Sequence, residues 1–366
     1  MNSWPNVALG SVINLKRGFD LPSHQRAEGN VPIFSSSGIS AYHNQIGAKG
    51  PGVITGRYGT IGLVFYSNED YWPLNTTLFV ENFKSNYPKF IYYALKNFDF
   101  EKFQDKSAVP GINRNDVHTE LIPLPSLPEQ KNIADVLSSL DDKIGLLHRQ
   151  NATLEAIAET LFRQWFVEAI KIEGAKIGRI VDLVEFNPKR KLAKGTVAPY
   201  LEMAALSTAT FHPDSWYDRE FASGTKFMNG DTLLARITPC LENGKSAYIT
   251  FLKDDEVAWG STEYIVMRSK LGLHPFFTYA LARNSDFREY AEGCLEGSSG
   301  RQRVDLEHLM NYEIAVPDQA IISKFNTAIS PIVPKLHANF TQIRILEKLR
   351  DNLLPKLISG EVRVNY

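Results

Sequence analysis

Apolar residues recur at alternating intervals of four and three positions along one stretch in the middle of the chain. This seam runs through Ile133, Leu137, Leu140, Ile144, Leu147, Asn151, Leu154, Ala158, Leu161 and Trp165. Such a heptad pattern predicts a helix with one apolar stripe that supercoils with a partner helix. Asn151 is the polar member of the seam, and a buried asparagine can fix the register of paired helices. We expect this helix within residues 128–172.

A second heptad seam lies near the end of the sequence. It runs through Ile322, Phe325, Ile329, Ile332, Leu336, Asn339, Ile343, Leu346, Leu353 and Leu357. Pro331 and Pro334 interrupt it, because proline lacks an amide donor and clashes with the preceding turn. We therefore expect a short helix to about Ser330 and a longer one to about Ile358, although Arg350 also falls on the seam. The two seams are expected to pack together; the alternative is that each helix packs on its own globular domain.

Four segments of the first half recur in the second half, in the same order and at an offset of roughly 186–189 residues. Residues 90–95 (FIYYAL) match 276–281 (FFTYAL), and 111–116 (GINRND) match 300–305 (GRQRVD). The two further matches join residues 75–80 to 261–266 and 128–130 to 317–319. Solenoid repeats are about 20–45 residues long, so this period indicates a duplicated domain.

Residue composition and hydrophobic pattern change in the same way within each copy. The first part of each copy is rich in glycine, proline, aromatic and β-branched residues in short alternating runs, which predicts several short strands. The second part is helical. The predicted fold is therefore a duplicated α/β (α+β) chain, in which two long antiparallel coiled-coil helices separate two globular mixed α/β domains. The expected boundaries are 1–127, 128–172, 173–316 and 317–366.

Composition favours a soluble protein, with 43% hydrophobic and 22% charged residues. No run reaches about 18 apolar residues, and the start lacks the pattern of a signal peptide, so we expect a cytoplasmic protein with no membrane partner. Cys240 and Cys294 lack metal-ligand spacing. The net charge of −1 argues only weakly against nucleic-acid binding, because basic loops on one face can coexist with acidic helices elsewhere.

Motifs that carry catalytic chemistry are missing from the sequence. Gly244-Lys245-Ser246 resembles the end of a phosphate-binding loop, but Pro239 stands where that motif needs a glycine. No His-Glu-x-x-His or Cys-x-x-Cys pair occurs, and residues 187–189 only approach the base-holding loop of amino-methyltransferases. We therefore expect no catalytic residue, no metal and no cofactor in this chain. An enzyme with an unrecognised active site remains an alternative.

Several strings, in this order, resemble one family, the specificity (S) subunits of type I restriction–modification systems. Segments that resemble one common class of target-recognition domain are 33–39, 52–62 and 71–77, and those that resemble another class are 236–245 and 260–263. Residues 127–131 with 161–167 resemble the central conserved helix of the family, and 353–362 resemble its C-terminal one. The resemblance covers essentially the whole chain.

This resemblance implies a subunit that binds double-stranded DNA but has no catalytic activity of its own. Two unlike recognition domains would read a bipartite, asymmetric target. Two methyltransferase (M) subunits would pack on the helices and methylate adenine N6 with S-adenosylmethionine, and translocase-nuclease (R) subunits would cut unmodified DNA. S-adenosylmethionine, ATP and Mg²⁺ would be bound by those partners. The alternative is a stand-alone DNA-binding or coiled-coil scaffold protein without a methyltransferase partner.

Candidate DNA contacts lie in polar, glycine-flanked loops, because Arg, Lys, Asn and Gln read base edges while Ser, Thr and amides hold phosphates. In the first domain they are Lys49, Arg57, Tyr58, Thr60, Asn113 and Arg114; in the second they are Arg236, Thr238, Asn243, Lys245, Arg301 and Arg303. The alternative is that each of these arginines braces its own loop. Near the end of the first helix, the apolar Phe162, Phe166 and Val167 suggest a contact with an M subunit.

Overall fold

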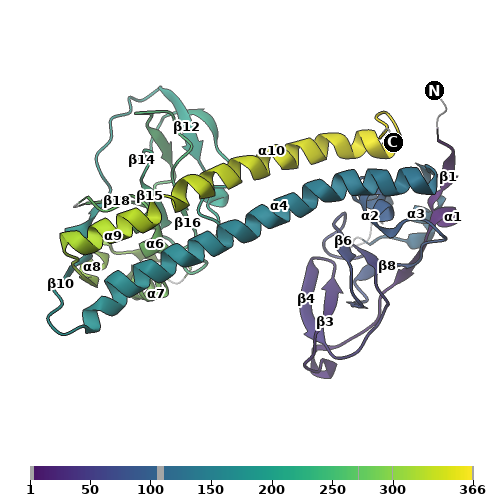
Figure 1. Ribbon diagram of the computed structural model, residues 1–366, viewed down its shortest axis with the longest axis horizontal. Coiled ribbons are helices and arrows are strands. Elements are labelled where there is room, and N and C mark those ends of the chain that lie inside the picture. The colour runs from purple at the N-terminus through teal and green to yellow at the C-terminus, as the bar shows by residue number, and fades with distance from the viewer. Residues whose placement is uncertain (1–3, 105–110, 271, 299, 365–366) are drawn as a thin grey trace. The chain divides into compact units, whose positions relative to one another are not determined.

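The computed structural model describes residues 4–104, 111–270, 272–298 and 300–364. The chain divides into two compact units: unit 1 comprises residues 1–144 and 345–366, and unit 2 comprises residues 145–344. Each unit contains a mixed α/β globule and part of two long helices, α4 (Leu127–Phe162) and α10 (Ile332–Ser359). The predicted fold class is confirmed (Figure 1).

The described residues of unit 1 form three small sheets. The four-stranded sheet has the order β2-β8-β5-β6, the three-stranded sheet has the order β4-β3-β7, and β1 pairs with β9. The strands are β1 (Asn6–Ala8), β2 (Asn14–Arg17), β3 (Val31–Ser35), β4 (Gly38–His43), β5 (Gly52–Gly56), β6 (Val64–Ser67), β7 (Trp72–Pro73), β8 (Thr77–Asn82) and β9 (Leu121–Pro123). The short helices are α1 (Leu9–Val12), α2 (Pro88–Lys96) and α3 (Arg114–Thr119), with 3₁₀ turns at Ser23–Gln25 and Phe100–Phe103.

Unit 2 is built in a similar way. Its two four-stranded sheets have the orders β11-β18-β15-β16 and β13-β12-β17-β14, and β10–β21 and β19–β20 form separate pairs. The strands are β10 (Ile177–Arg179), β11 (Val184–Phe186), β12 (Val197–Leu201), β13 (Tyr217–Glu220), β14 (Thr225–Phe227), β15 (Thr232–Ala235), β16 (Ser246–Tyr248), β17 (Ala258–Gly260), β18 (Tyr264–Ser269), β19 (Leu295–Glu296), β20 (Arg303–Val304) and β21 (Glu313–Ala315). The helices are α5 (Ile180–Leu183), α6 (Phe277–Arg283), α7 (Ser285–Gly293), α8 (Leu306–Leu309) and α9 (Gln319–Ile329), with a 3₁₀ turn at Met203–Ala205.

The sequence repeat is also a structural repeat. Sheet β2-β8-β5-β6 of unit 1 and sheet β11-β18-β15-β16 of unit 2 are antiparallel throughout and have the same order relative to the chain. Each unit adds one parallel pair in its other sheet, β3 with β7 and β12 with β17. Helix α2 contains the FIYYAL string and α6 begins at the second residue of the matching FFTYAL string; the two helices follow the corresponding strands β8 and β18. The chain therefore carries two copies of one domain.

The long helices close the cores of both units. In unit 1, Ile133 and Leu137 of α4 and Leu357 of α10 pack with Phe90 of α2 and Leu78 of β8, and all five side chains are buried. The helices are antiparallel, since α4 meets the end of α10 in unit 1 and the beginning of α10 in unit 2. Burial of this stripe explains the heptad pattern. Among the described residues, no helix combines the length and apolar character that crossing a membrane requires.

Polar residues on the two seams pair with each other or with the domain beside them. In unit 2, the buried Asn339 amide donates a hydrogen bond to the Asn151 Oδ1 atom at 2.9 Å. In unit 1, Arg350 donates to Asp141 Oδ1 at 2.9 Å, and Asp141 also accepts from the Tyr93 hydroxyl of α2 at 2.8 Å. These hydrogen bonds satisfy the polar groups that interrupt the apolar stripe. Without a partner, a buried amide or charge would destabilise the folded helices.

The end of α4 differs from the expected partner contact. The α-helical part of this segment ends at Phe162. It is followed by a π-helical turn (Arg163–Val167) and a 3₁₀ turn (Glu168–Lys171). Phe162 and Phe166 are fully buried, and Val167 packs against the same core of unit 2. The expectation that these side chains meet an M subunit is therefore wrong for the two phenylalanines, because their own domain covers them.

Candidate nucleic-acid interface

In unit 1, the candidate loops come together at one end of the four-stranded sheet. The Ile112 N–H donates to the Arg57 carbonyl at 3.0 Å, and Tyr58 forms a β-bridge with Gly111. Asn113 then caps α3, its Oδ1 atom accepting from the Asn115 N–H at 3.0 Å. The chain thus places Arg57, Tyr58, Asn113 and Arg114 side by side, although two of them lie far from the other two in sequence.

A hollow of about 310 Å³ opens between these loops, lined by Arg17, Arg57, Tyr58, Leu78, Ile112, Asn113 and Arg114. The Arg57 guanidinium lies over the Tyr58 ring at 4.5 Å from its centroid. Arg17 sits at the end of β2 and is the basic lining residue that sequence reasoning missed. The available signal was the basic pair Lys16-Arg17 directly before Gly18.

Two other candidates of unit 1 do not line this hollow. Lys49 forms an ion pair with Asp70 at 2.8 Å, and this hydrogen bond, with a second from the Gly50 N–H, lowers the pKa of the Asp70 carboxyl. Thr60 is exposed, and its carbonyl packs so closely on Gly56 that a Cβ there would lie 1.8 Å from the oxygen. Gly56 is therefore required by the tight loop itself.

Unit 2 repeats this construction with different side chains. The Val304 N–H donates to the Arg236 carbonyl at 2.8 Å, and Thr238 exchanges hydrogen bonds with Gln302 at 3.1 and 3.2 Å. The backbone N–H of Arg236 donates to the carbonyl of Glu263 at 3.0 Å. In unit 1 the N–H of Arg57 donates to the carbonyl of Thr76 at 2.8 Å, so Glu263 and Thr76 occupy equivalent places.

The arginines of unit 2 are held by the protein. Arg236 donates to the Val304 carbonyl at 2.9 Å, and Arg303 contacts both oxygens of Glu263 at 2.7–2.9 Å. Lys245 donates to the Met203 carbonyl at 3.1 Å. The candidates Asn243 and Arg301 are exposed, and so is Arg303 despite its ion pair. The structure thus brings Arg236, Thr238, Arg301 and Arg303 into one loop cluster, but it turns two of the guanidinium groups toward their own domain.

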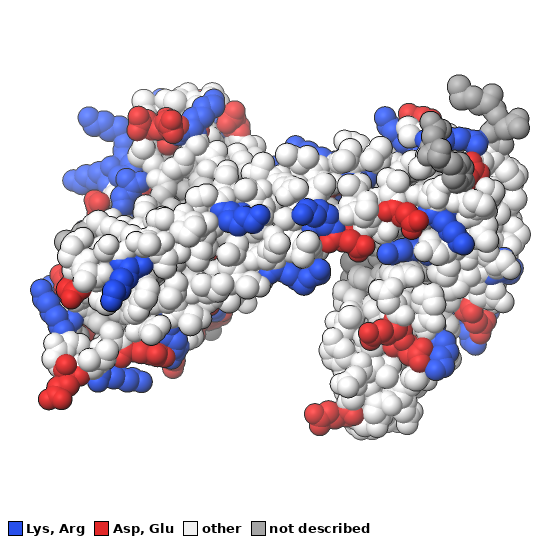
Figure 2. Space-filling view, in the orientation of Figure 1, with Lys and Arg blue, Asp and Glu red and all other residues white. Residues whose placement is uncertain are grey.

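A second basic loop of unit 2 was missed by sequence reasoning. Lys189, Lys191 and Lys194 are exposed, whereas Arg190 turns inward to the buried carboxylate of Asp231, with its Nη2 atom 3.3 Å from Oδ1. Lys226 donates to the Leu192 carbonyl at 3.2 Å, which fixes the middle of the loop. Lys and Arg side chains gather over this part of unit 2, beside β12 and β14 (Figure 2). Residues 187–194 therefore form an ordered loop that presents three lysines.

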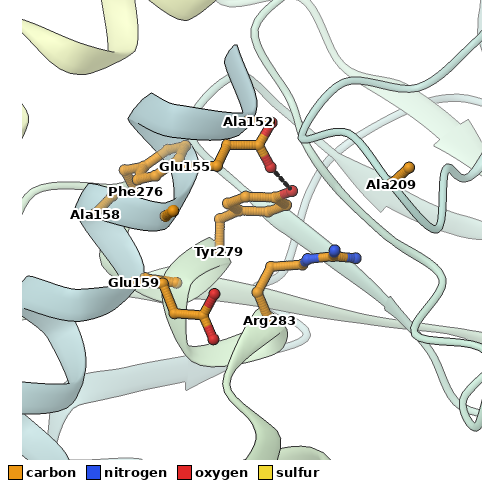
Figure 3. A pocket seen from close by; sticks show the side chains of 10 residues that line it. Ala152, Glu155, Ala158, Glu159, Ala209, Phe276, Tyr279 and Arg283 are labelled. Atoms are coloured by element: carbon orange, nitrogen blue, oxygen red, sulfur yellow. Dashed lines mark hydrogen bonds between the residues drawn. The ribbon is translucent and has the colours of Figure 1, made fainter. Parts of the chain in front are cut away.

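Another hollow in unit 2, of about 220 Å³, lies between α4 and α6 (Figure 3). Glu155 and Glu159 of α4 face Tyr279 and Arg283 of α6, and the Tyr279 hydroxyl donates to Glu155 at 2.8 Å. Burial raises the pKa of Glu155, although the Tyr279 hydrogen bond opposes this effect. Arg283 also donates to the Thr208 carbonyl at 2.9 Å. The Glu155–Tyr279 hydrogen bond joins the two helices, and Arg283 is held by the Thr208 carbonyl, so we interpret the hollow as a structural junction.

Similar proteins span nearly the whole chain. Residues 1–156 match the family model of the type I restriction modification DNA specificity domain. The specificity subunit of the type I restriction enzyme MjaIX from Methanocaldococcus jannaschii is 27% identical, in an alignment that covers 93% of this chain and 83% of that protein. The HindI specificity subunit from Haemophilus influenzae is 22% identical, over 99% of this chain and 100% of that protein. The crystal structure of a type I restriction-modification S subunit from M. genitalium shares the fold, with a TM-score of 0.64, 17% identity and coverage of 97% and 96%.

Proposed function

Because the chain belongs to the family of type I restriction–modification specificity subunits, we propose that it selects the DNA sequence on which such a system acts. The observation that carries this proposal is the repeated loop construction at the end of a central strand. Unit 1 builds it with Arg57 and Tyr58, and unit 2 builds it with Arg236 and Thr238. Two equivalent surfaces with unlike side chains would read unlike half-sites, so the target is bipartite and asymmetric.

In this proposal the chain recognises the target sequence, and partner subunits catalyse the reactions. Two M subunits bind the paired helices, take adenines out of the duplex and methylate N6 with S-adenosylmethionine. R subunits join the complex, and they use ATP and Mg²⁺ when they cut unmodified DNA. The support for this division of work is the absence of recognised catalytic motifs in the sequence, together with the relatives, which are named specificity subunits.

The loop residues divide into two kinds by their surroundings. Asn243 and Arg301 of unit 2 and Thr60 of unit 1 are exposed and carry groups that read base edges or hold phosphates. Arg236 and Arg303 shape their loop through Val304 and Glu263. We assign loop bracing to Arg236 and Arg303 because their guanidinium groups are already bound by Val304 and Glu263, although Arg303 is exposed. We assign base reading to Thr60, Asn243 and Arg301.

A methylation map tests the proposal. The chain is co-expressed with the M subunit from its own source, the complex is purified, and methylated adenines on host DNA are mapped by single-molecule sequencing. We expect a single bipartite asymmetric motif that disappears when this chain is deleted. Methylation that survives the deletion, or methylation of DNA by the purified chain alone with S-adenosylmethionine, would contradict the assignment.

A further inference from the structure

The arginine-lined hollow of unit 1 gathers three cations from three separate elements. Arg17 ends β2, Arg57 follows β5 and Arg114 begins α3. Arg17 pairs with the exposed Asp20 at 3.3 Å, and Arg114 contacts the Leu15 carbonyl at 3.4 Å and interacts electrostatically with Glu81. Like charges held together repel unless an anion lies between them, so this arrangement favours binding of an anion.

Among the anions that the proposed function brings to this surface, a backbone phosphate fits the hollow best. Planar guanidinium groups match the oxygens of a phosphate in pairs of hydrogen bonds. Arg57 lies stacked on Tyr58 inside the hollow rather than extended from it, so its partner must project toward the protein. Phosphates project from a duplex, whereas base edges lie in a major groove about 8.5 Å deep.

In unit 2, arginines at the loops that correspond to the hollow of unit 1 are bound by the protein itself. Arg303 is held there by both carboxylate oxygens of Glu263, and Arg236 is held by the Val304 carbonyl. In unit 1, Thr76 takes the place of Glu263 and brings no carboxylate. Strand β11, which corresponds to β2, carries no basic residue at Val184–Phe186. The open arginine hollow thus belongs to one copy of the domain.

We propose that the hollow formed by Arg17, Arg57 and Arg114 binds one backbone phosphate of the target DNA and anchors unit 1 without selecting bases. This inference rests on the proposed function, and it assigns Arg57 and Arg114 to the DNA backbone and not to base edges. Phosphate contacts fix the register of a protein on the duplex, and their contribution is the same for every sequence.

The test measures binding of the purified complex with its M subunits to a target duplex and to a scrambled duplex, over a range of salt concentrations. For Arg17→Ala and Arg114→Ala we expect roughly tenfold weaker binding to both duplexes, with a salt slope that falls by about one for each lost contact. Arg17→Lys should lose less affinity than Arg17→Ala. The matched control Lys102→Ala removes an exposed cation outside the hollow and should change neither quantity.

Two results would overturn the inference. A loss of preference for the target duplex, with an unchanged salt slope, would make these arginines base readers. Unchanged affinity and slope would make them ordinary surface charges. If the wild-type complex shows no preference between the duplexes, the proposed function fails, but the salt slopes on either duplex still decide whether the hollow binds phosphate.

Discussion

Asp231→Ala is expected to destabilise unit 2 by roughly 3 kcal/mol, because it leaves two guanidinium groups without their shared counter-charge. Asp231 is 0% exposed and lies 2.6 Å from the Arg268 Nε atom and 3.3 Å from the Arg190 Nη2 atom. Breaking a buried ion pair costs about 3–5 kcal/mol. We expect the lower end of that range, since the side chain of Arg268 is 35% exposed and can regain water.

The same substitution should loosen the lysine loop at residues 187–194. Arg190 is the residue of that loop that anchors it to Asp231, so amide hydrogen exchange should become faster there and in β15, but stay unchanged in unit 1. Asp231→Asn keeps an acceptor for the Met228 N–H, at 2.8 Å from Asp231, and should cost less than alanine. The control Asp218→Ala removes an exposed carboxylate. Equal exchange rates in the Asp231 and Asp218 variants would show that the buried pair does not order the loop.

Phe166→Ala is expected to destabilise unit 2 by about 4 kcal/mol, through lost burial and the cavity that remains. Phe166 is fully buried, and its ring centroid lies 4.9 Å from that of Phe277 and 5.1 Å from that of Phe325. These rings come from α6 and α9, so the turn after α4 locks three elements together. Urea unfolding followed by hydrogen exchange in α6 and α9 measures the loss.

This experiment also separates core packing from partner binding. Phe166→Leu keeps most of the apolar volume, and it should cost less than about 1.5 kcal/mol. A partner contact would behave in the opposite way: Phe166→Ala would leave the unfolding transition of the free chain in place and weaken only the binding of the M subunit. That outcome would restore the interpretation that the apolar sequence first suggested.

The helices could be predicted from sequence because their signals are periodic. The heptad spacing located α4 and α10, and prolines 331 and 334 predicted the break that the structure places between Ile329 and Ile332. The seam could not explain Arg350, because its partner Asp141 belongs to the other helix. Phe166 was misread for a similar reason: the turn that follows α4 rotates it into the domain core, and no local pattern encodes that rotation.

The sequence indicated which polar loop residues are candidates for DNA contacts, but not which way their side chains point. Arg57 and Arg236 follow equivalent strands, β5 and β15. A sequence does not show that Glu263 holds Arg303, or that Thr76, in the place of Glu263, brings no carboxylate to unit 1. Arg17 was missed because its place beside the hollow depends on the pairing of β2 with β8, which lies about 60 residues further along the chain. Residues 187–189 only approach a methyltransferase motif in sequence, and the anchoring of the lysine loop 187–194 could not be predicted because Asp231 is distant along the chain.

We propose that each domain reads its own half of the target, and a methylation map of a variant in one domain tests this proposal. We expect the combined substitution Asn243→Ala and Arg301→Ala in unit 2 to relax the bases of one half-site only. The other half-site and the spacer between them should stay unchanged. If both halves of the motif degrade together, or if the wild-type motif is a palindrome, the two domains do not act as independent readers and the account is wrong.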